Sequence, residues 1–548
     1  MLTLPLDPTD DRAKPAFNDV AGCRQWLGQL QFTNMQQAHA VLRGQLDELN
    51  HYPMRGLERL NILESMRETV SYVQADYSKK LIGKKLPLSE DELVIFVSIV
   101  GLWQNMVGGY QRCLQTLLSG DKQLVKQGVL LCQRCLLYSG LQIFEHLRSG
   151  YEFDGRLWQQ MHELYAFSEE QGYQLEKVND DLDGKNHPTS CQAIYVKTLL
   201  ACYARPAELT RSQLKLLDRW LIQWSATITL GRRYTISKGD APPLAVDLAS
   251  LRGLQPIGLI SPPPAHADEV ASSMRCLAML PLSKLMRVKI ILLQQGQTPQ
   301  QLELGEECSS ADCADLLNFL HHCWCELQGD RLAERCSAAQ PAKVCYGLEG
   351  IYAHIANKPF KQSGKGGAVD SLERKQIATF GRVLSEDKRN TLADLGFALE
   401  DWQIENESIL GAHLLREEMA GARIGPNQIV AVRPADAAAY MLGAISWVHM
   451  TQAGQLSAGA RYLPGVAQAI AVNSTGVNAS MSGKSAAALL LPAVAALKTP
   501  SSLLLPRGWF QPGRVIEIVH QDNQKLSVKL GFSVEKGSDF ERVSFSPV

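Results

Sequence analysis

The sequence has almost no excess of charge, because 55 Lys and Arg residues balance 56 Asp and Glu residues for a formal net charge of -1. A strongly basic balance is typical of proteins that bind nucleic acid or an anionic membrane surface. The composition therefore predicts no nucleic-acid partner. With 45% hydrophobic and 20% charged residues in 548, the chain is an ordinary globular protein, long enough for about two to four domains.

Long hydrophobic runs are also lacking. The longest, Leu93 to Trp103, is interrupted by Ser98 and is too short to cross a bilayer, so it predicts a buried helix. Residues 1–12 carry acidic side chains early and contain no apolar segment of signal-peptide length. Together these observations predict a cytoplasmic protein without membrane insertion.

A disulfide framework is missing, although the chain has 13 cysteines. Their odd number and irregular spacing predict a reducing compartment. They are densest between residues 308 and 345, where His321 and His322 also lie, and zinc could use four such ligands. Residues 316–327 nevertheless have the pattern of one apolar helix, in which free cysteine is a common core residue. We therefore expect no metal and no cofactor.

Catalytic patterns are absent as well, since no spacing suggests a Ser-His-Asp or Cys-His site. Gly483-Lys484-Ser485 matches the end of a P-loop, but the required first glycine is replaced by Asn478. A P-loop also needs a helix that opens at the lysine inside a parallel sheet. We expect instead a loop of small residues between two β-modules. The sequence predicts no enzyme, and a nucleotide hydrolase is only a third alternative.

What the sequence does contain, up to about residue 360, is helical periodicity. Apolar residues recur at three- and four-residue steps at Leu63, Met66, Val70, Val73 and Tyr77. Ser89 and Thr210 each precede an apolar segment, with Glu92 and Gln213 three residues later, which predicts helix starts. The expected arrangement is paired antiparallel helices, bundle-like or solenoid-like.

Residues 226–247 interrupt this pattern with alternating Thr, Ile, Tyr and Val and with Gly-Asp and Pro-Pro breaks. They predict a short hairpin or an extended insert. Arg232 and Arg233 either reach an anionic partner from this insert or form a solvated turn. Residues 361–368 are polar, basic and rich in glycine, which predicts a linker.

Beyond the linker the hydrophobic period becomes that of strands. The predicted strands are residues 428–433, 440–448, 459–463, 469–473, 502–505, 514–520, 525–530 and 542–545. Two adjoining β-modules, or one barrel with a β-extension, fit this series.

The stretch Trp402 to Gly411 opens the β-rich part and contains Asn406-x-Ser408-x-x-Gly411. This spacing predicts a tight bend with a carboxamide and a hydroxyl available for edge-on hydrogen bonds. Glycine would supply a positive φ and let a flat ligand approach the backbone closely.

These residues resemble the PilZ domain, a small β-barrel that binds cyclic di-GMP in many bacterial proteins. Its second signature is Asp/Asn-x-Ser-x-x-Gly, which Asn406, Ser408 and Gly411 match. The strands at 443–447 and 459–463 resemble those that follow in the family. The resemblance implies that Asn406 and Ser408 take a guanine edge and that Gly411 permits its close approach.

The family's first signature, Arg-x-x-x-Arg, precedes this bend and grips the nucleotide phosphates. In residues 371–382, Arg374 is followed four positions later by Ala378, so the signature is broken there. Arg374, Lys375 and Arg382 would then supply the positive charge without the expected spacing. Because bidentate phosphate recognition needs arginine at a defined place, the broken signature puts nucleotide binding in question.

The predicted fold class is therefore multidomain α + β. A helical domain (1–360) with an insert near 226–247 is followed by a linker (361–370), a PilZ-like antiparallel β-barrel (371–475) and a small C-terminal β-module (476–548). The predicted function is a non-enzymatic, cyclic di-GMP-responsive signalling protein in which the barrel regulates a helical interaction domain. The alternative is a scaffold that has lost the nucleotide and acts through protein partners in a pilus, flagellar or secretion assembly.

Overall fold

The computed structural model describes residues 2, 4, 6–180, 188–233, 243–260, 271–326, 336–360, 392–393, 396–417, 420–475 and 484–548. The chain divides into two compact units. The helical unit comprises residues 1–84 and 88–330, and the barrel unit comprises residues 85–87 and 331–548.

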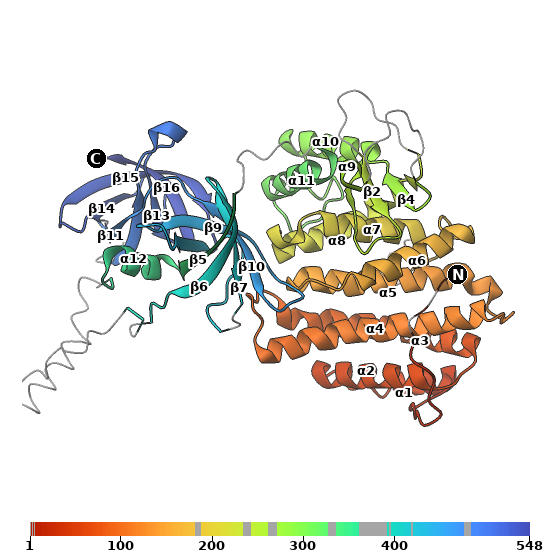
Figure 1. The fold of residues 1–548 in the computed structure, drawn as a ribbon. Coiled ribbons are helices and arrows are strands. Elements are labelled where there is room, and N and C mark those ends of the chain that lie inside the picture. Colours follow the sequence, from red (N-terminus) through yellow and green to blue (C-terminus); the bar gives the residue numbers. More distant parts are fainter. Residues whose placement is uncertain are drawn as a thin grey trace, which may run out of the picture. The chain divides into compact units, whose positions relative to one another are not determined.

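The helical unit is a stack of helices in which each layer packs on the next (Figure 1). The helices are α1 (Val20–Leu27), α2 (Met35–His51), α3 (Gly56–Tyr77), α4 (Glu90–Leu118), α5 (Gly128–Ser149), α6 (Arg156–Glu170), α7 (Cys191–Tyr203), α8 (Arg211–Trp224), α9 (Ile257–Ile260), α10 (Leu280–Gln294) and α11 (Ser310–Cys325). One hydrophobic core runs through the unit. The predicted stripe on α3 lies in it, since all five of its residues are at most 3% exposed.

Both predicted helix starts are present as capping boxes. The Ser89 hydroxyl accepts from the backbone N–H of Glu92, whose carboxylate accepts from the Ser89 N–H. Thr210 and Gln213 make the same reciprocal pair at the start of α8. Because each box satisfies N–H groups that the first helical turn leaves without partners, it fixes where the helix begins.

Among the described helices, α4 alone is long and apolar enough to cross a membrane, with 29 residues and a mean hydropathy of 1.5 in its most apolar window. Half of that window is buried. Leu102, Met106 and Leu114 of this helix belong to the core of the helical unit, where α4 packs on α2, α3 and α5. A core helix of this kind passes the same test of length and composition, so the test is weak evidence for a membrane span.

The insert forms part of a small sheet and not a hairpin of its own. The strands are β1 (Leu230–Gly231), β2 (Leu244–Asp247), β3 (Gln255–Pro256) and β4 (Met274–Leu277), in the order β1-β4-β2-β3. Both β1 and β2 pair with β4, which begins 43 residues after the end of β1 and 27 after the end of β2, so local alternation alone did not reveal their partner. Residues 234–242 lie outside the described part.

His162 in α6 makes the stability of the helical unit depend on pH. Its ring is fully buried, with Nε2 2.9 Å from the Arg252 carbonyl oxygen and Nδ1 2.6 Å from the Tyr195 hydroxyl. These partners suit a neutral ring that donates from Nε2 and accepts at Nδ1. Burial lowers the pKa of His162 from 6.5 to about 4.

Because the pKa of His162 is higher in the unfolded chain, the unfolded chain is protonated first as pH falls. The contribution of neutral His162 to stability is therefore fully present above pH 6.5. It is lost as pH falls toward 4, by about 3 kcal/mol in total. Urea unfolding of the helical signal at several pH values measures this slope. A His162→Gln variant is expected to show a shallower slope than the wild type, whatever its absolute stability. Equal slopes in the two proteins would contradict the assignment.

The barrel unit contains two closed antiparallel barrels of six strands each (Figure 1). One helix packs on both barrels. The first barrel has the order β10-β7-β6-β5-β8-β9 and the second β11-β12-β13-β16-β15-β14. The elements are β5 (Cys336–Tyr346), α12 (Leu348–Ala356), β6 (Glu400–Ser408), β7 (Gly411–Arg416), β8 (Ile429–Pro434), β9 (Met441–Met450), β10 (Leu456–Tyr462), β11 (Gln468–Ser474), β12 (Ser485–Leu491), β13 (Ser502–Pro506), β14 (Val515–Val519), β15 (Lys525–Lys536) and β16 (Phe540–Pro547). The predicted fold class is confirmed, and the C-terminal β-module is itself a closed barrel.

The first barrel begins earlier in the chain than predicted. Strand β5 pairs with both β6 and β8, so the barrel starts near residue 336 and not at 371. Helix α12, which lies inside the predicted helical domain (1–360), packs instead on strands of both barrels. Its buried residues Leu348 and Ile351 share a core with Leu442 of the first barrel and Leu489 of the second. The predicted linker at 361–370 lies outside the described residues.

Candidate functional site

The Asn-x-Ser-x-x-Gly motif forms the hairpin between β6 and β7. Asn406 lies within β6, Ser408 is its last residue, and Gly411 opens β7 opposite Ser408. The Ser408 hydroxyl accepts from the Leu410 N–H and donates to the Gly411 carbonyl oxygen, both at 3.3 Å. These bonds hold the two-residue turn, so the predicted bend is present as a hairpin tip.

Gly411 serves a different purpose from the one predicted. Its φ is not among the positive values of the described glycines, so the bend does not depend on a left-handed glycine. A Cβ at this position would lie 2.2 Å from the Ala460 carbonyl oxygen of β10. Glycine is therefore required here because β7 and β10 approach each other too closely for any side chain.

Asn406 begins a row of polar and aromatic side chains, which we call the outer strip: Asn406, His413, Trp447, His449 and Ser457. The strip crosses β6, β7, β10 and β9, which are neighbours in the first barrel. Its members alternate along their strands with the buried residues Leu414, Val448 and Ala458, so they lie on the opposite face of the sheet. They come from segments as far apart in the chain as residues 406 and 457. Ser457 is itself buried, with 2% of its surface exposed.

Contacts along the outer strip link its members directly. His413 Nδ1 lies 3.5 Å from Asn406 Nδ2, and His413 Nε2 lies 2.9 Å from the Ser457 hydroxyl. The Trp447 ring lies 5.2 Å from the His413 ring and is stacked on His449 at 5.3 Å. A Cβ on Gly459 would lie 2.2 Å from Trp447 Nε1, so the indole lies flat across a strand that has no side chain there.

The strip offers a chemistry suited to a planar, hydrogen-bonding ligand. Indole and imidazole rings supply faces for stacking, and the carboxamide and hydroxyl supply donors and acceptors for the edge of a base. Beside the hairpin tip, the Tyr462 hydroxyl donates to Glu407 Oε1 at 2.6 Å. Burial, reinforced by Glu407, raises the pKa of Tyr462, so the phenol stays protonated and holds the Glu407 carboxylate in place.

The start of β5 lies directly against the motif. In the β5–β6 register, Cys336 is opposite Glu407 and Ser337 is opposite Asn406. The five residues that precede β5 in the sequence are Arg331-Leu-Ala-Glu-Arg335, which has the intact Arg-x-x-x-Arg spacing. The signature was sought at 371–382, where the barrel was predicted to start and where its spacing is broken, whereas this intact spacing stands directly before the first strand of the barrel.

The other predicted cations, Arg374, Lys375 and Arg382, lie outside the described residues. The Arg331-x-x-x-Arg335 spacing can be read directly from the sequence. It became significant only once β5 was known to be the first strand of the barrel.

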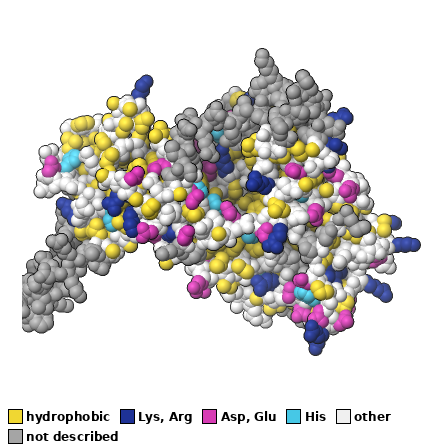
Figure 2. Space-filling model, viewed as in Figure 1, with side chains coloured by type: hydrophobic (Ala, Val, Ile, Leu, Met, Phe, Trp, Pro, Cys, Tyr) yellow, Lys and Arg dark blue, Asp and Glu magenta, His cyan; other side chains and the backbone are white. Residues whose placement is uncertain are grey.

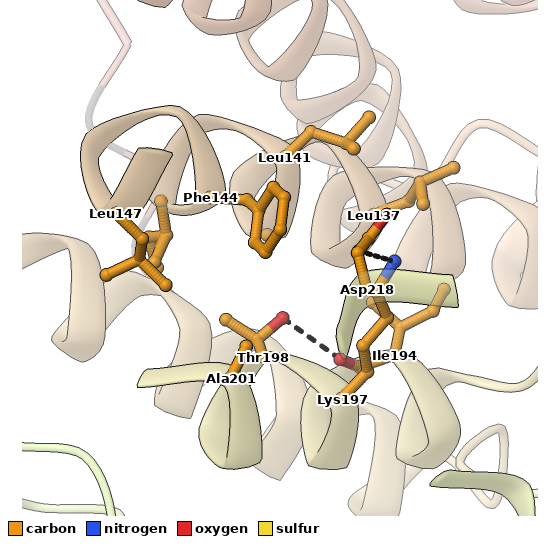
Figure 3. A pocket seen from close by; sticks show the side chains of 11 residues that line it. Leu137, Leu141, Phe144, Leu147, Ile194, Lys197, Thr198, Ala201 and Asp218 are labelled. Carbon is orange, nitrogen blue, oxygen red and sulfur yellow. Dashed lines mark hydrogen bonds and ion pairs between the residues drawn. The ribbon is translucent and has the colours of Figure 1, made fainter. Parts of the chain in front are cut away.

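A pocket between α5, α7 and α8 is too small for a nucleotide (Figure 3). Leu141 and Phe144 face Thr198 and Ala201 across it, and Lys197 pairs with Asp218 at 2.7 Å. Its volume is about 30 Å³, close to the space that one water molecule takes. A methyl group on Gly140 would lie 2.7 Å from the Thr198 hydroxyl, so this is a tightly packed helix contact.

The residues that suggested a metal site lie in two different units, and the residues that suggested a P-loop lead into a strand. Cys345 lies in the barrel unit, whereas Cys308, Cys313 and Cys323 lie in the helical unit. In the described part of the chain, no group of three or more His, Cys, Asp and Glu side chains is placed to hold a metal ion. Ser485 opens strand β12 where a P-loop requires a helix, which argues against the nucleotide hydrolase.

Comparison with known proteins matches both ends of the chain to one kind of protein. The family model described as the cyclic-di-GMP receptor FimW, N-terminal domain, matches residues 21–233, and the FimW C-terminal beta-barrel domain matches residues 475–548. Each of the two models describes a domain of the same receptor. The cyclic-di-GMP receptor FimW of Pseudomonas aeruginosa is 22% identical to this chain, over 99% of its length and 93% of that protein.

The matched ranges agree with the division of the fold into its units and barrels. The N-terminal match lies within the helical unit, and the C-terminal match covers most of the second barrel. The first barrel, with the hairpin motif and the outer strip, lies between them. The resemblance to a cyclic di-GMP receptor with a long helical N-terminal region is thereby confirmed.

Proposed function

We propose that the protein is a cytoplasmic, non-enzymatic receptor for cyclic di-GMP, which binds at the β6–β7 hairpin of the first barrel. The observation that carries this proposal is the register of β5 on β6. It brings the strand that follows Arg331-x-x-x-Arg335 alongside Asn406 and Glu407 of the second signature. The relative from Pseudomonas aeruginosa, whose name describes a cyclic-di-GMP receptor, supports the same ligand.

Each group in this site has a role that its chemistry allows. The guanidinium groups of Arg331 and Arg335 bind the phosphates, because arginine recognises phosphate oxygens in a bidentate manner. Asn406 and Ser408 contact a guanine edge, and Trp447 offers a face on which a base stacks. Arg374, Lys375 and Arg382 remain a prediction from the sequence, in which their charge adds to the attraction for the phosphates.

Binding at the first barrel would alter how the helical unit is presented to a protein partner. The mixed surface supports a protein partner over a nucleic acid, since acidic and basic side chains are interspersed on the face shown in Figure 2. The scaffold alternative rested on the broken arginine signature. The intact Arg331-x-x-x-Arg335 spacing removes that support and favours the receptor.

Isothermal titration of cyclic di-GMP into the full chain tests the proposal. The wild type is expected to bind saturably, and an Asn406→Ala, Ser408→Ala variant is expected to bind about ten- to fifty-fold more weakly, since two hydrogen bonds to the ligand are lost. The matched control is Asn473→Ala on the second barrel, where Asn473 donates to Glu517 at 3.1 Å. It is expected to bind like the wild type.

Absence of heat from the wild type at high protein concentration would contradict the receptor proposal and leave the scaffold. Equal weakening by the double variant and by Asn473→Ala would show that the effect comes from loss of the fold. Thermal unfolding of each variant, followed by circular dichroism, provides the check on folding.

A further inference from the structure

Arg461 presents a guanidinium group beside the hairpin motif. In β10 it lies opposite Gly411 of β7, and its Cα is 3.2 Å from the position that a Gly411 Cβ would take. Cross-strand neighbours point to the same side of a sheet, so Arg461 faces outward on the same side as His413, two residues along β7. Gly411 carries no side chain, so none stands between Arg461 and the hairpin.

A carboxylate of the second barrel forms an ion pair with the Arg461 guanidinium group. The Arg461 Nη2 atom donates to Glu535 Oε1 of β15. The Arg461 side chain is 51% exposed and that of Glu535 is 22% exposed, so the pair lies at the surface within reach of a ligand.

Glu535 also faces a second arginine. It lies opposite Arg542 of β16, which is buried and donates from Nε to the Ser502 hydroxyl at 2.8 Å. Burial lowers the pKa of Arg542, and Glu535 opposes that effect. One carboxylate therefore lies between two guanidinium groups, one from each barrel. When Glu535 separates from Arg461, it keeps Arg542 as a second cationic partner. This reduces the free-energy cost of exchanging the carboxylate for another anion at Arg461.

We propose that Arg461 is a further phosphate-binding residue of the nucleotide site and that Glu535 competes with the ligand phosphate for it. This inference rests on the proposed function of the first barrel. The phosphodiester of a cyclic dinucleotide carries the same charge and the same kind of acceptor oxygens as the carboxylate it displaces. Ligand binding and the Arg461–Glu535 contact between the barrels therefore exclude each other.

Titration of cyclic di-GMP into the full-length wild type and three variants tests this competition. Glu535→Gln removes the competing charge and is expected to tighten binding about two- to five-fold, as expected for loss of an exposed ion pair. Arg461→Gln is expected to weaken binding at least five-fold, and the double variant is expected to match Arg461→Gln. The matched control is Glu517→Gln, since Glu517 pairs with Lys525 at 3.1 Å within the second barrel. It is expected to change affinity less than two-fold.

A second measurement reports the barrel contact itself. At saturating cyclic di-GMP, amide hydrogen exchange of residues 533–541 is expected to speed up in the wild type and to stay unchanged in Glu535→Gln. Binding by the wild type with no effect of Glu535→Gln would overturn this inference and leave the receptor proposal standing. No binding by any of the four proteins would overturn both. If Glu535→Gln bound the ligand and the wild type did not, the Arg461–Glu535 contact would be shown to block the site completely.

Discussion

Replacing Arg331 and Arg335 together by alanine is expected to weaken binding of cyclic di-GMP at least about 100-fold. Charge-assisted hydrogen bonds contribute about 1.5–3 kcal/mol each, so two arginines account for a loss of this size or more. The conservative double variant, Arg331→Lys with Arg335→Lys, keeps both charges. It is expected to recover only part of the affinity, because lysine lacks the planar fork of the guanidinium group.

Isothermal titration at about physiological salt measures this loss, since screening of the phosphates depends on ionic strength. The control is Arg374→Ala with Arg382→Ala, which removes two of the cations first considered and is expected to weaken binding less than three-fold. If this control abolished binding while Arg331→Ala with Arg335→Ala did not, the assignment of the phosphate-binding arginines would be reversed.

Glu400→Gln is expected to destabilise the first barrel by about 3–5 kcal/mol, because it leaves a buried guanidinium without its counter-charge. The Arg416 side chain is 2% exposed and donates from Nη1 to Glu400 Oε2 at 2.6 Å. It also lies over the ring of Trp402, 5.3 Å from the ring centre. Glu400 further accepts from the Trp402 indole at 3.2 Å and from the Ala422 N–H, so one carboxylate organises this end of the barrel.

Amide hydrogen exchange in β6 and β7 measures this change locally, which matters because a chain of two units need not unfold in a single step. The control is Asp401→Asn at the next position. Asp401 pairs with Lys343 at 2.6 Å, but both side chains are largely exposed, at 77% and 45%. Its loss is expected to cost at most about 1 kcal/mol. Similar losses at the two positions would show that the buried pair contributes no more than the exposed one.

Much of the fold follows from local patterns in the sequence. The three- and four-residue spacing along α3 identified its buried face, and Ser89 and Thr210 marked the starts of α4 and α8 through capping boxes. The alternating segments from residue 428 onward are the strands β8 to β11 and β13 to β16. The hairpin motif was likewise recognisable, because Asn406, Ser408 and Gly411 lie within six consecutive residues. Each of these features depends on neighbours along the chain.

What the sequence alone did not decide was which distant segments pair. Strand β5 contains Gln340, Pro341 and Lys343, so its alternation is weak, and its partner β6 begins more than fifty residues later. Helix α12 has an ordinary apolar face, and only packing showed that this face belongs to the barrels. The Arg-x-x-x-Arg spacing at 331–335 acquired its meaning from the same pairing. Local periodicity determined the elements, whereas contacts between residues far apart in the chain decided where the barrel begins and which side chains form its candidate site.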